Sequence, residues 1–312
     1  MECLIGIDLG GTQLRAALLT RSGAILAQAR CASLVAEGPA AVVARIGTLV
    51  AQVLDALPVG AGVAAIGLGA PGPLDPQAGV IIGAPNMPGW NDVPLRQMVA
   101  AATGMRVVLG NDADAAALGE WRFGAGRGYR HLVYLTVSTG IGGGVIADGK
   151  LLPGRRGAAG ELGFLILDAE AGICWEDLAS GTALAKAAAA AMPAHPRSLL
   201  HRLATPETVG GAAVSQAARA GDPLACALMD REARLLGAGL ASILHIFSPE
   251  IVLLGGSVMI NNPDLLPQAA AAAYRMARHD LYREVPIVPA ALGDQAGVLG
   301  AAALVLSVDG MA

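Results

Sequence analysis

The sequence lacks any apolar run long enough to cross a membrane. Its longest apolar windows, at 235–247 and 296–308, are shorter than the roughly 18 to 20 residues that a membrane span requires. The chain also begins without a basic segment, because Glu2 precedes an apolar, strand-like run, so we predict no secretory signal. We therefore expect a soluble protein of the cytoplasm with no membrane partner.

Paired cysteines and concentrated positive charge are also missing. The four cysteines stand far apart, at positions 3, 31, 174 and 226, and form no CxxC pair. This spacing excludes a zinc ribbon and a disulfide framework. The 21 Lys and Arg residues are scattered and the formal net charge is −4, which argues against binding to a phosphate backbone. We expect no nucleic-acid partner.

Hydrophobic residues and glycine, in contrast, are abundant. The 312 residues are 54% hydrophobic and include 42 glycines, enough to bury the cores of two compact domains. The first half of the chain predicts strands at 4–9, 14–20, 23–30, 63–69, 80–83 and 105–110, and helices at 38–57, 94–104 and 113–124.

The second half of the chain repeats this organisation. It predicts strands at 131–137, 142–148, 163–168, 250–256 and 285–290, and helices at 180–192, 207–220, 222–246, 263–279 and 295–308. Each half starts with a strand pair bent around a glycine-rich turn that carries a hydroxyl residue, DLGGT at 8–12 and STGIGGG at 138–144. Two such turns facing each other across a cleft would present N–H groups and hydroxyls to one polyphosphate.

Two other glycine-rich segments imitate nucleotide-binding motifs. GLGAPG at 67–72 matches G-x-G-x-x-G after a strand, but Pro71, Pro73 and Pro76 prevent the helix that this fingerprint must open. GVIADGKL at 144–151 approaches the P-loop pattern, but Leu151 replaces the hydroxyl residue and the segment indicates a hairpin. We reject both.

Amide and carboxylate side chains are set among small residues at several points. Asn111 and Asp112 stand at a strand-to-helix junction, where either side chain is also a candidate helix N-cap. Further polar groups occur in PNMPGW, GELG and WED, namely Asn86, Glu161, Glu176 and Asp177. Such groups can grip a ring of hydroxyls, although the alternative that the acids are plain surface-loop residues stays open.

Together these segments resemble a known family. DLGGTQLRAALL, GLGAPGPLD, PNMPGWNDVPL, NDADAAALGEW, STGIGGGVI, GELG, LASGTAL, LLGGSV and LGDQAGVLGAAAL occur in the order found in the ROK (repressor, open reading frame, kinase) family of bacterial sugar kinases. The resemblance is to a glucokinase-type member. It implies a duplicated α/β, actin-like ATPase (ribonuclease H-like) fold with two domains around a cleft, 1–111 plus 297–312 and 112–296, and a C-terminal helix packed on the first domain.

The resemblance also implies an activity and its residues. The expected reaction is ATP-dependent phosphorylation of a hexose, glucose at its 6-hydroxyl, by a homodimer or homotetramer. Asp112 would be the catalytic base and would bind the sugar with Asn86, Asn111, Glu161 and Glu176. The ATP and Mg²⁺ site would consist of Asp8, which holds Mg²⁺ through water, with Gly10, Gly11, Thr12, Thr139, Gly140, Gly255 and Gly256.

One segment departs from the family pattern. The family usually follows GELG with a histidine and a cysteine-rich loop that together hold zinc, whereas this chain has Phe164 and, before LASG, only AGICWED. Without four ligands we predict no zinc site. Cys174 is expected to be a small packed hydrophobe, and Trp175 to form a wall of the sugar pocket. Packing around Phe164 and Trp175 would then replace the zinc.

Alternatives remain open after this comparison. The sugar can be fructose, mannose, N-acetylglucosamine or N-acetylmannosamine, and the phosphate donor can be ATP, ADP or polyphosphate. A non-catalytic sugar sensor on the same scaffold is a further alternative, although it would not need Asp112. A repressor is not expected, since DLGGT begins at residue 8 and leaves no room for a DNA-binding domain before it.

Overall fold

A computed structural model describes residues 1–84 and 87–309 of the chain. These residues form two compact units, which we describe separately. Unit 1 contains residues 1–130, 144–160 and the chain from 294 onward, and unit 2 contains residues 131–143 and 161–293. No helix of the described residues combines the length and the apolar character needed to cross a bilayer.

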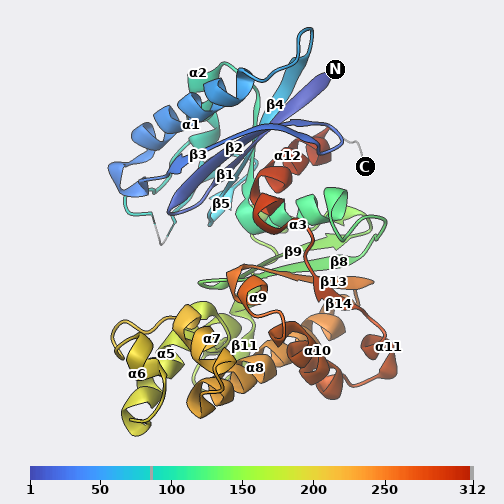
Figure 1. Ribbon diagram of the computed structural model, residues 1–312. Helices are drawn as coiled ribbons and strands as arrows, with labels where there is room; N and C mark the ends of the chain where they lie inside the picture. Colours follow the sequence, from blue (N-terminus) through green and yellow to red (C-terminus); the bar gives the residue numbers. More distant parts are fainter. Residues whose placement is uncertain (85–86, 310–312) are drawn as a thin grey trace. The chain divides into compact units, whose positions relative to one another are not determined.

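Unit 1 is built on a five-stranded mixed sheet of order β3-β2-β1-β4-β7 (Figure 1). Its strands are β1 (Glu2–Leu9), β2 (Gln13–Thr20), β3 (Ile25–Ala32), β4 (Gly62–Ala70) and β7 (Val107–Asn111). β1, β2 and β3 pair in antiparallel fashion, whereas β4 runs parallel to β1 and to β7. The predicted hairpin around the first glycine-rich turn is confirmed, since Leu9 pairs with Leu14 across it.

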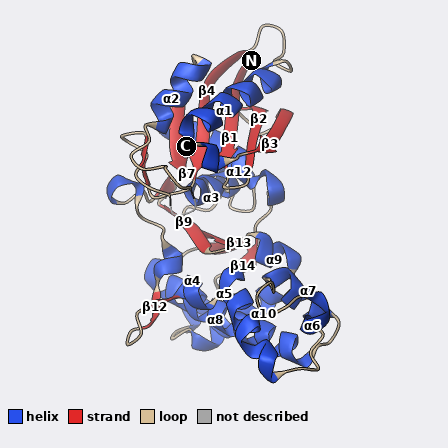
Figure 2. Ribbon diagram, turned by 90° about the vertical axis from the view of Figure 1, so that its left-hand side faces the viewer, coloured by secondary structure: helices blue, strands red, loops and turns tan. Residues whose placement is uncertain are grey.

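Helices cover both faces of this sheet. The alternating apolar residues of β1 and β2 pack on one face against α1 (Pro39–Leu54) and α2 (Leu95–Thr103), as Figure 2 shows for the strands and these helices. The opposite face carries α12 (Ala296–Val308), which also packs on α3 (Asp112–Phe123). The remaining strands of unit 1 are short: β5 (Leu74–Asp75), β6 (Val80–Ile81) and β10 (Lys150–Leu151).

Glycines allow α12 to lie directly on the backbone of the sheet. A Cβ atom on Gly6 would stand 2.0 Å from the carbonyl oxygen of Val298, and one on Gly67 would stand 1.7 Å from that of Ala301. No side chain larger than hydrogen fits in these gaps without moving the helix. The C-terminal helix therefore belongs to unit 1, as the resemblance implies.

The second five-stranded sheet has the order β10-β9-β8-β13-β14. It contains β8 (Leu132–Val137), β9 (Ile141–Ala147), which passes from unit 2 into unit 1, β13 (Ile251–Gly255) and β14 (Ile287–Pro289). β9 and β10 are antiparallel, while β13 is parallel to β8 and to β14. Both sheets thus combine an antiparallel hairpin with parallel strands, which confirms the prediction of two similar halves.

The rest of unit 2 is mainly helical (Figure 2). Its helices are α4 (Trp175–Leu178), α5 (Gly181–Ala191), α6 (Leu200–Leu203), α7 (Gly211–Arg219), α8 (Pro223–Phe247), α9 (Ser257–Asn261), α10 (Leu265–Met276) and α11 (Asp280–Arg283), and a small sheet joins β11 (Ile166–Asp168) to β12 (Ile173–Cys174). α8 is the central helix. It is capped by Asp222, whose carboxylate accepts from Ala225 N at 2.8 Å.

The two rejected motifs adopt the predicted structures. After Ala70 the chain leaves β4 without opening a helix. At the second motif, β9 and β10 form a hairpin in which Ala147 pairs with Lys150. Asp148 and Gly149 between them both have positive φ, as a two-residue turn of the twist-compatible type requires.

The boundary between the two compact units does not fall after residue 111, as the predicted domain division has it, but after residue 130, and residues 144–160 return to unit 1. α3 belongs to unit 1, because it crosses α12 where a Cβ on Gly119 would stand 2.9 Å from the Gly300 backbone. Residues 144–160 also join unit 1, where Arg156 Nε donates to Asp75 Oδ2 at 2.8 Å.

Glu232 is a fully buried carboxyl group in α8. Neither of its oxygens has a hydrogen-bond partner among the described residues. Burial raises its pKa to about 8, and the nearby positive charge of Arg231 only partly opposes this shift. Because the pKa is higher in the folded chain than in the unfolded one, the folded state holds a proton that the unfolded state releases between about pH 4.5 and 8.

We therefore expect Glu232→Gln to flatten the pH dependence of stability. In the wild type, the free energy of unfolding should fall as pH rises through this window, by up to about 1.4 kcal/mol per pH unit from Glu232. Urea unfolding of both proteins from pH 5 to 8 measures the difference, in which the other titrating groups cancel. Parallel curves for the two proteins would contradict the expectation.

Candidate active site

Asp8 and the glycine-rich turn after it form the first part of the site, in unit 1. The turn is held by Gly10 N, which donates to Gln13 O at 2.9 Å, while Gly11 and Thr12 are exposed. The Asp8 side chain is 17% exposed, and Arg15 Nε lies 3.4 Å from its Oδ2. Burial raises the pKa of the Asp8 carboxyl, and the charge of Arg15 opposes that effect. The turn thus offers N–H groups and a hydroxyl beside one shielded carboxylate.

Asn111 and Asp112 lie where β7 ends and α3 begins, also in unit 1. Asn111 is the helix N-cap, because its Oδ1 accepts from Ala113 N at 2.8 Å and from Asp114 N at 3.2 Å. Asp112 Oδ1 accepts from Ala113 N at 2.8 Å. The cap fixes the direction of both half-buried side chains, and it leaves the Asn111 amide nitrogen as a donor.

The second glycine-rich turn, in unit 2, joins β8 to β9. Ser138 N donates to Gly140 O at 2.9 Å, and Thr139 at the tip is exposed. The start of α5 is bonded to this turn, since Gly181 N donates to Ser138 O at 2.8 Å and Thr182 N to Thr139 O at 3.2 Å. The hydroxyls of Ser138 and Ser257 lie 2.9 Å apart. The first residues of α5 and of α9 therefore both bond to the turn and restrict its movement.

Glu161 and Glu176 come together in unit 2 next to the same turn. Glu176 Oε2 accepts from Ile141 N at 3.0 Å, and a Cβ on Gly140 would stand 2.5 Å from this oxygen. Desolvation and the negative charge of Glu176 raise the pKa of Glu161. The Glu176 carboxylate is thus bonded to the turn, and Glu161 lies close enough to be affected by the charge of Glu176.

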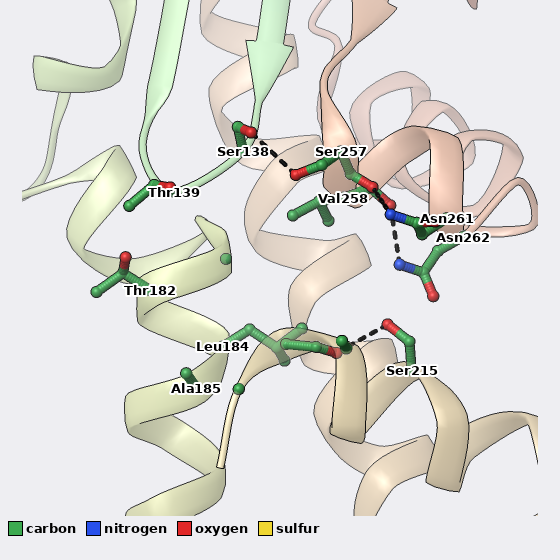
Figure 3. Close-up of a pocket in the computed structure, with 14 residues that line it drawn as sticks. Ser138, Thr139, Thr182, Leu184, Ala185, Ser215, Ser257, Val258, Asn261 and Asn262 are labelled. Atoms are coloured by element: carbon green, nitrogen blue, oxygen red, sulfur yellow. Dashed lines mark hydrogen bonds between the residues drawn. The ribbon is translucent and has the colours of Figure 1, made fainter. Parts of the chain in front are cut away.

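A cavity of about 370 Å³ opens beside this turn (Figure 3). Its lining comes from the turn, from α5 and α7 and from α9: Ser138, Thr139, Gly181, Thr182, Leu184, Ala185, Gly210, Gly211, Ala212, Ser215, Ser257, Val258, Asn261 and Asn262. Hydroxyls gather at the turn, whereas Leu184, Ala185 and Val258 supply apolar surface. The cavity can hold a flat apolar group with polar edges next to the glycine-rich turn.

Two amides at the end of α9 have a defined orientation. Asn261 Nδ2 donates to Ser257 O and Asn262 Nδ2 donates to Val258 O, each at 2.8 Å. Because a carbonyl oxygen must face an NH₂ group, these bonds fix which end of each amide is the oxygen. Figure 3 shows the Asn262 oxygen turned away from its bond to α9. The cavity thus gains hydrogen-bond acceptors at this edge.

Asn86, Gly255 and Gly256 were also expected to bind ligands. Asn86 lies outside the described residues. Gly255 and Gly256 do not line the cavity. A Cβ on Gly256 would stand 2.3 Å from Val137 O, so this glycine lets the end of β13 approach β8 and sets the position of Ser257.

Most of the residues that line the cavity were not predicted from the sequence. Gly181 and Thr182 belong to LASGTAL, a segment that resembles the family but in which no ligand-binding residue was predicted. The paired glycines at 210–211 and the paired asparagines at 261–262 were the remaining signals in the sequence.

The segment with Cys174 and Trp175 differs from three predictions. Cys174 is half-buried rather than a packed hydrophobe, because it caps α4 and its thiol donates to Asp177 Oδ2 at 2.8 Å, which raises the thiol pKa. Trp175 does not wall a pocket. It is completely buried against α8, where its Nε1 donates to Leu235 O at 2.9 Å and its ring covers Gly239. Phe164 is 57% exposed. Of the two aromatic residues expected to pack this segment, only Trp175 does so.

Within residues 1–84 and 87–309, no three His, Cys, Asp or Glu side chains are grouped so that they could hold a metal ion.

Comparisons with known proteins cover nearly the whole chain. The profile of the ROK family matches residues 4–308. The chain is 36% identical to a glucokinase of Thermotoga maritima over 97% of its length and 96% of the relative's. It superimposes on a ROK family glucokinase from Streptomyces griseus solved with glucose and AMPPNP (TM-score 0.82, 35% identity, 97% and 98% of the two chains). A ROK hexokinase from Thermus thermophilus gives a TM-score of 0.84 at 37% identity, over 99% of each chain.

Proposed function

The chain belongs to the ROK family and has the actin-like ATPase fold, and from this premise we propose that it is a sugar kinase that phosphorylates glucose. The enzyme transfers the γ-phosphoryl group of ATP to the 6-hydroxyl of glucose and releases glucose 6-phosphate and ADP. Glucokinases that match over nearly the full length support this assignment.

One contact in unit 2 supports the proposal most directly. Glu176 Oε2 accepts from Ile141 N at 3.0 Å, so a carboxylate suited to sugar hydroxyls is bonded to the turn suited to phosphates. A phosphoryl group and its acceptor hydroxyl must be held in line and close together, because positioning supplies much of the catalysis in this reaction. A direct bond between the two binding elements provides that alignment.

Asp112 is the proposed general base. Its carboxylate accepts the proton of the 6-hydroxyl as the oxygen attacks phosphorus, so the attacking group gains nucleophilic character without becoming a free alkoxide. Asn111 uses its oxygen to cap α3, so its amide nitrogen is left to donate to a sugar oxygen. Glu161 and Glu176 accept from further hydroxyls of the ring.

Residues of both glycine-rich turns are the proposed phosphate ligands. Gly10, Gly11 and Thr12 contact the β- and γ-phosphates, as do Thr139 and Gly140. Mg²⁺ neutralises phosphate charge when it is bound. Asp8 suits this ion: it offers a hard oxygen donor, and its raised pKa reflects a buried charge that a further cation would stabilise.

The cavity beside α9 is the proposed site of the nucleoside. Its apolar walls at Leu184, Ala185 and Val258 suit a purine, and the oxygens of Asn261 and Asn262 can accept from the amino group of adenine. A polyphosphate donor would need neither feature. We therefore propose ATP as the phosphate donor rather than polyphosphate.

A kinase for an N-acetylhexosamine is the second candidate. Phe164 is 57% exposed, three residues after Glu161, and its N–H donates to Glu161 O at 3.1 Å. An exposed apolar ring this close to a proposed sugar ligand offers a contact for the methyl group of an N-acetyl substituent.

A coupled assay of ADP release tests the function. We expect purified protein with Mg²⁺ and ATP to release ADP on addition of glucose, with lower kcat/KM for mannose, fructose, N-acetylglucosamine and N-acetylmannosamine. Polyphosphate and GTP in place of ATP test the donor site. If an N-acetylhexosamine gives the highest kcat/KM, the second candidate replaces the first. If no sugar stimulates ADP release, the protein is not a sugar kinase.

A further inference from the structure

A second cavity, of about 540 Å³, lies in unit 1 beside the edge strand β3. Polar side chains of β2, β3 and the segment that leads into α12 dominate its lining: Gln13, Arg15, Gln28, Arg30, Asp294 and Gln295. Gln28 Nε2 donates to Gln295 Oε1 and so joins β3 to the start of α12. None of the residues proposed above to contact sugar or nucleotide lines this cavity.

Two arginines face this cavity from neighbouring strands. Arg15 on β2 is the direct register partner of Arg30 on β3. Side chains of directly paired residues project from the same face of an antiparallel pair, with Cβ atoms about 5 Å apart. Like charges in this arrangement repel each other and destabilise the strand pair. An anion between the two guanidinium groups would remove this repulsion.

The charges around the arginine pair are not balanced within the cavity. Arg30 has no hydrogen bond or ion pair with any residue of 1–84 or 87–309. Arg15 donates from Nη1 to the carbonyl of Asp294 at 2.8 Å, and its Nε faces Asp8 at 3.4 Å. The carboxylate of Asp294 is the acidic group of the lining, and it is exposed.

We propose that this cavity binds a phosphate group, either free or as a phosphomonoester, between Arg15 and Arg30. Guanidinium groups present planar, paired N–H donors that match phosphate oxygens, and such bonds between ions are stronger than neutral ones. Gln13, Gln28 and Gln295 surround the pair with amides that can donate to the remaining oxygens. Arg30 supplies a positive charge that no described residue pairs with and so gives the cavity its preference for anions, while Arg15 adds N–H donors from a guanidinium that already faces Asp8.

Arg15 connects this cavity to Asp8. The same guanidinium that would bind the phosphate group also faces the Asp8 carboxylate. Phosphate in the cavity therefore competes with Asp8 for Arg15 and changes the charge around Asp8. The effect of this charge on catalysis rests on the proposed kinase function, in which Asp8 holds Mg²⁺. Binding of phosphate to the cavity does not depend on that function.

Calorimetric titration with inorganic phosphate and, separately, with a hexose 6-phosphate tests the site. Glucose and a non-hydrolysable ATP analogue are kept saturating, so that the active site is not available to either ligand. We expect the full-length wild type to bind phosphate and Arg30→Gln to bind it at least about tenfold more weakly. Arg130→Gln is the matched control, since Arg130 is an exposed arginine of unit 1 that pairs with Asp148, and its affinity should equal that of the wild type.

The two ligands distinguish the sources of the phosphate group. If inorganic phosphate and the hexose 6-phosphate bind equally well, the cavity recognises the phosphate group alone. If the hexose 6-phosphate binds more tightly, the ligand of the cavity is a phosphomonoester. Absence of phosphate binding in the wild type, or equal binding by Arg30→Gln, overturns the proposal. These results hold even if the protein fails the ADP-release assay, so the failure of the site and the failure of the kinase function are separable.

Thermal unfolding provides a second, independent readout. Arg30→Glu replaces the repulsion by an opposite-charge pair with Arg15, so the variant should unfold at a higher temperature than the wild type without phosphate. It should also lose the rise in unfolding temperature that phosphate gives the wild type. A variant that retains the full phosphate-dependent rise contradicts the site.

Discussion

Replacement of Asp112 by asparagine is expected to lower kcat by about 10²- to 10⁴-fold, the usual contribution of a positioned general base. The Kd for glucose should change little. Asparagine keeps a side-chain oxygen that can accept from Ala113 N, as Asp112 Oδ1 does at 2.8 Å, but its amide cannot take up a proton from the sugar hydroxyl. Steady-state kinetics with ATP and calorimetric titration with glucose measure the two quantities.

Asp222, which caps another helix, provides the control for this variant. Asp222 caps α8 with bonds to Ala225 N at 2.8 Å, Leu199 N at 2.8 Å and Ser198 Oγ at 2.9 Å. Asp222→Asn should lower the unfolding temperature and leave kcat unchanged. If Asp112→Asn behaves in the same way, with a loss of stability and normal kcat, Asp112 is a structural cap and the proposed base is wrong.

Trp175→Ala is expected to reduce the free energy of unfolding by about 3–5 kcal/mol, the range found for large aromatic residues removed from a core. The indole is completely buried, bonded to Leu235 O and packed on Gly239. Its loss leaves a cavity under α4 and removes the side-chain hydrogen bond that joins α4 to α8. Because Glu176 follows Trp175 directly, the KM for glucose should rise as well.

The KM effect separates local displacement of Glu176 from general loss of stability. Leu244→Ala removes another completely buried side chain from α8 and should also cost about 2–5 kcal/mol. It should leave the KM for glucose at the wild-type value, because Leu244 stands about 7.5 Å along α8 beyond Gly239, on which Trp175 packs. Urea unfolding and steady-state kinetics of both variants give the comparison. An unchanged KM in Trp175→Ala would show that Trp175 does not position the sugar-binding segment.

The fold was predictable because most of its helices and strands have a recognisable pattern of apolar, glycine or proline residues in the sequence. The turn at 8–12 has the glycines that a tight hairpin requires, and β1 and β2 carry the alternating apolar residues that pack under α1. Elements of four or five residues, such as α4 and α9, were missed, since so few residues carry no periodicity.

The local bonding of the candidate site was less predictable than its residues. A strand-to-helix junction identified Asn111 as a potential cap, and the structure gives it that place. Nothing in the sequence could indicate that Glu176 would bond to Ile141, thirty-five residues earlier, or that Trp175 would reach α8. Such contacts depend on how elements pack in three dimensions, and the spacing of residues along the chain does not encode them.

The contact of α12 with the bare backbone of Gly6 and Gly67 also determines when unit 1 can be completed during synthesis. A ribosome makes the chain from its N-terminus, so the first sheet emerges long before the helix at 296–308 that must cover it. Until this helix leaves the exit tunnel, one face of that sheet stays open to solvent or to a chaperone. All residues of unit 2, which ends at residue 293, are made before this helix. Unit 1 contains the first strands to be made and is still the last of the two units to close.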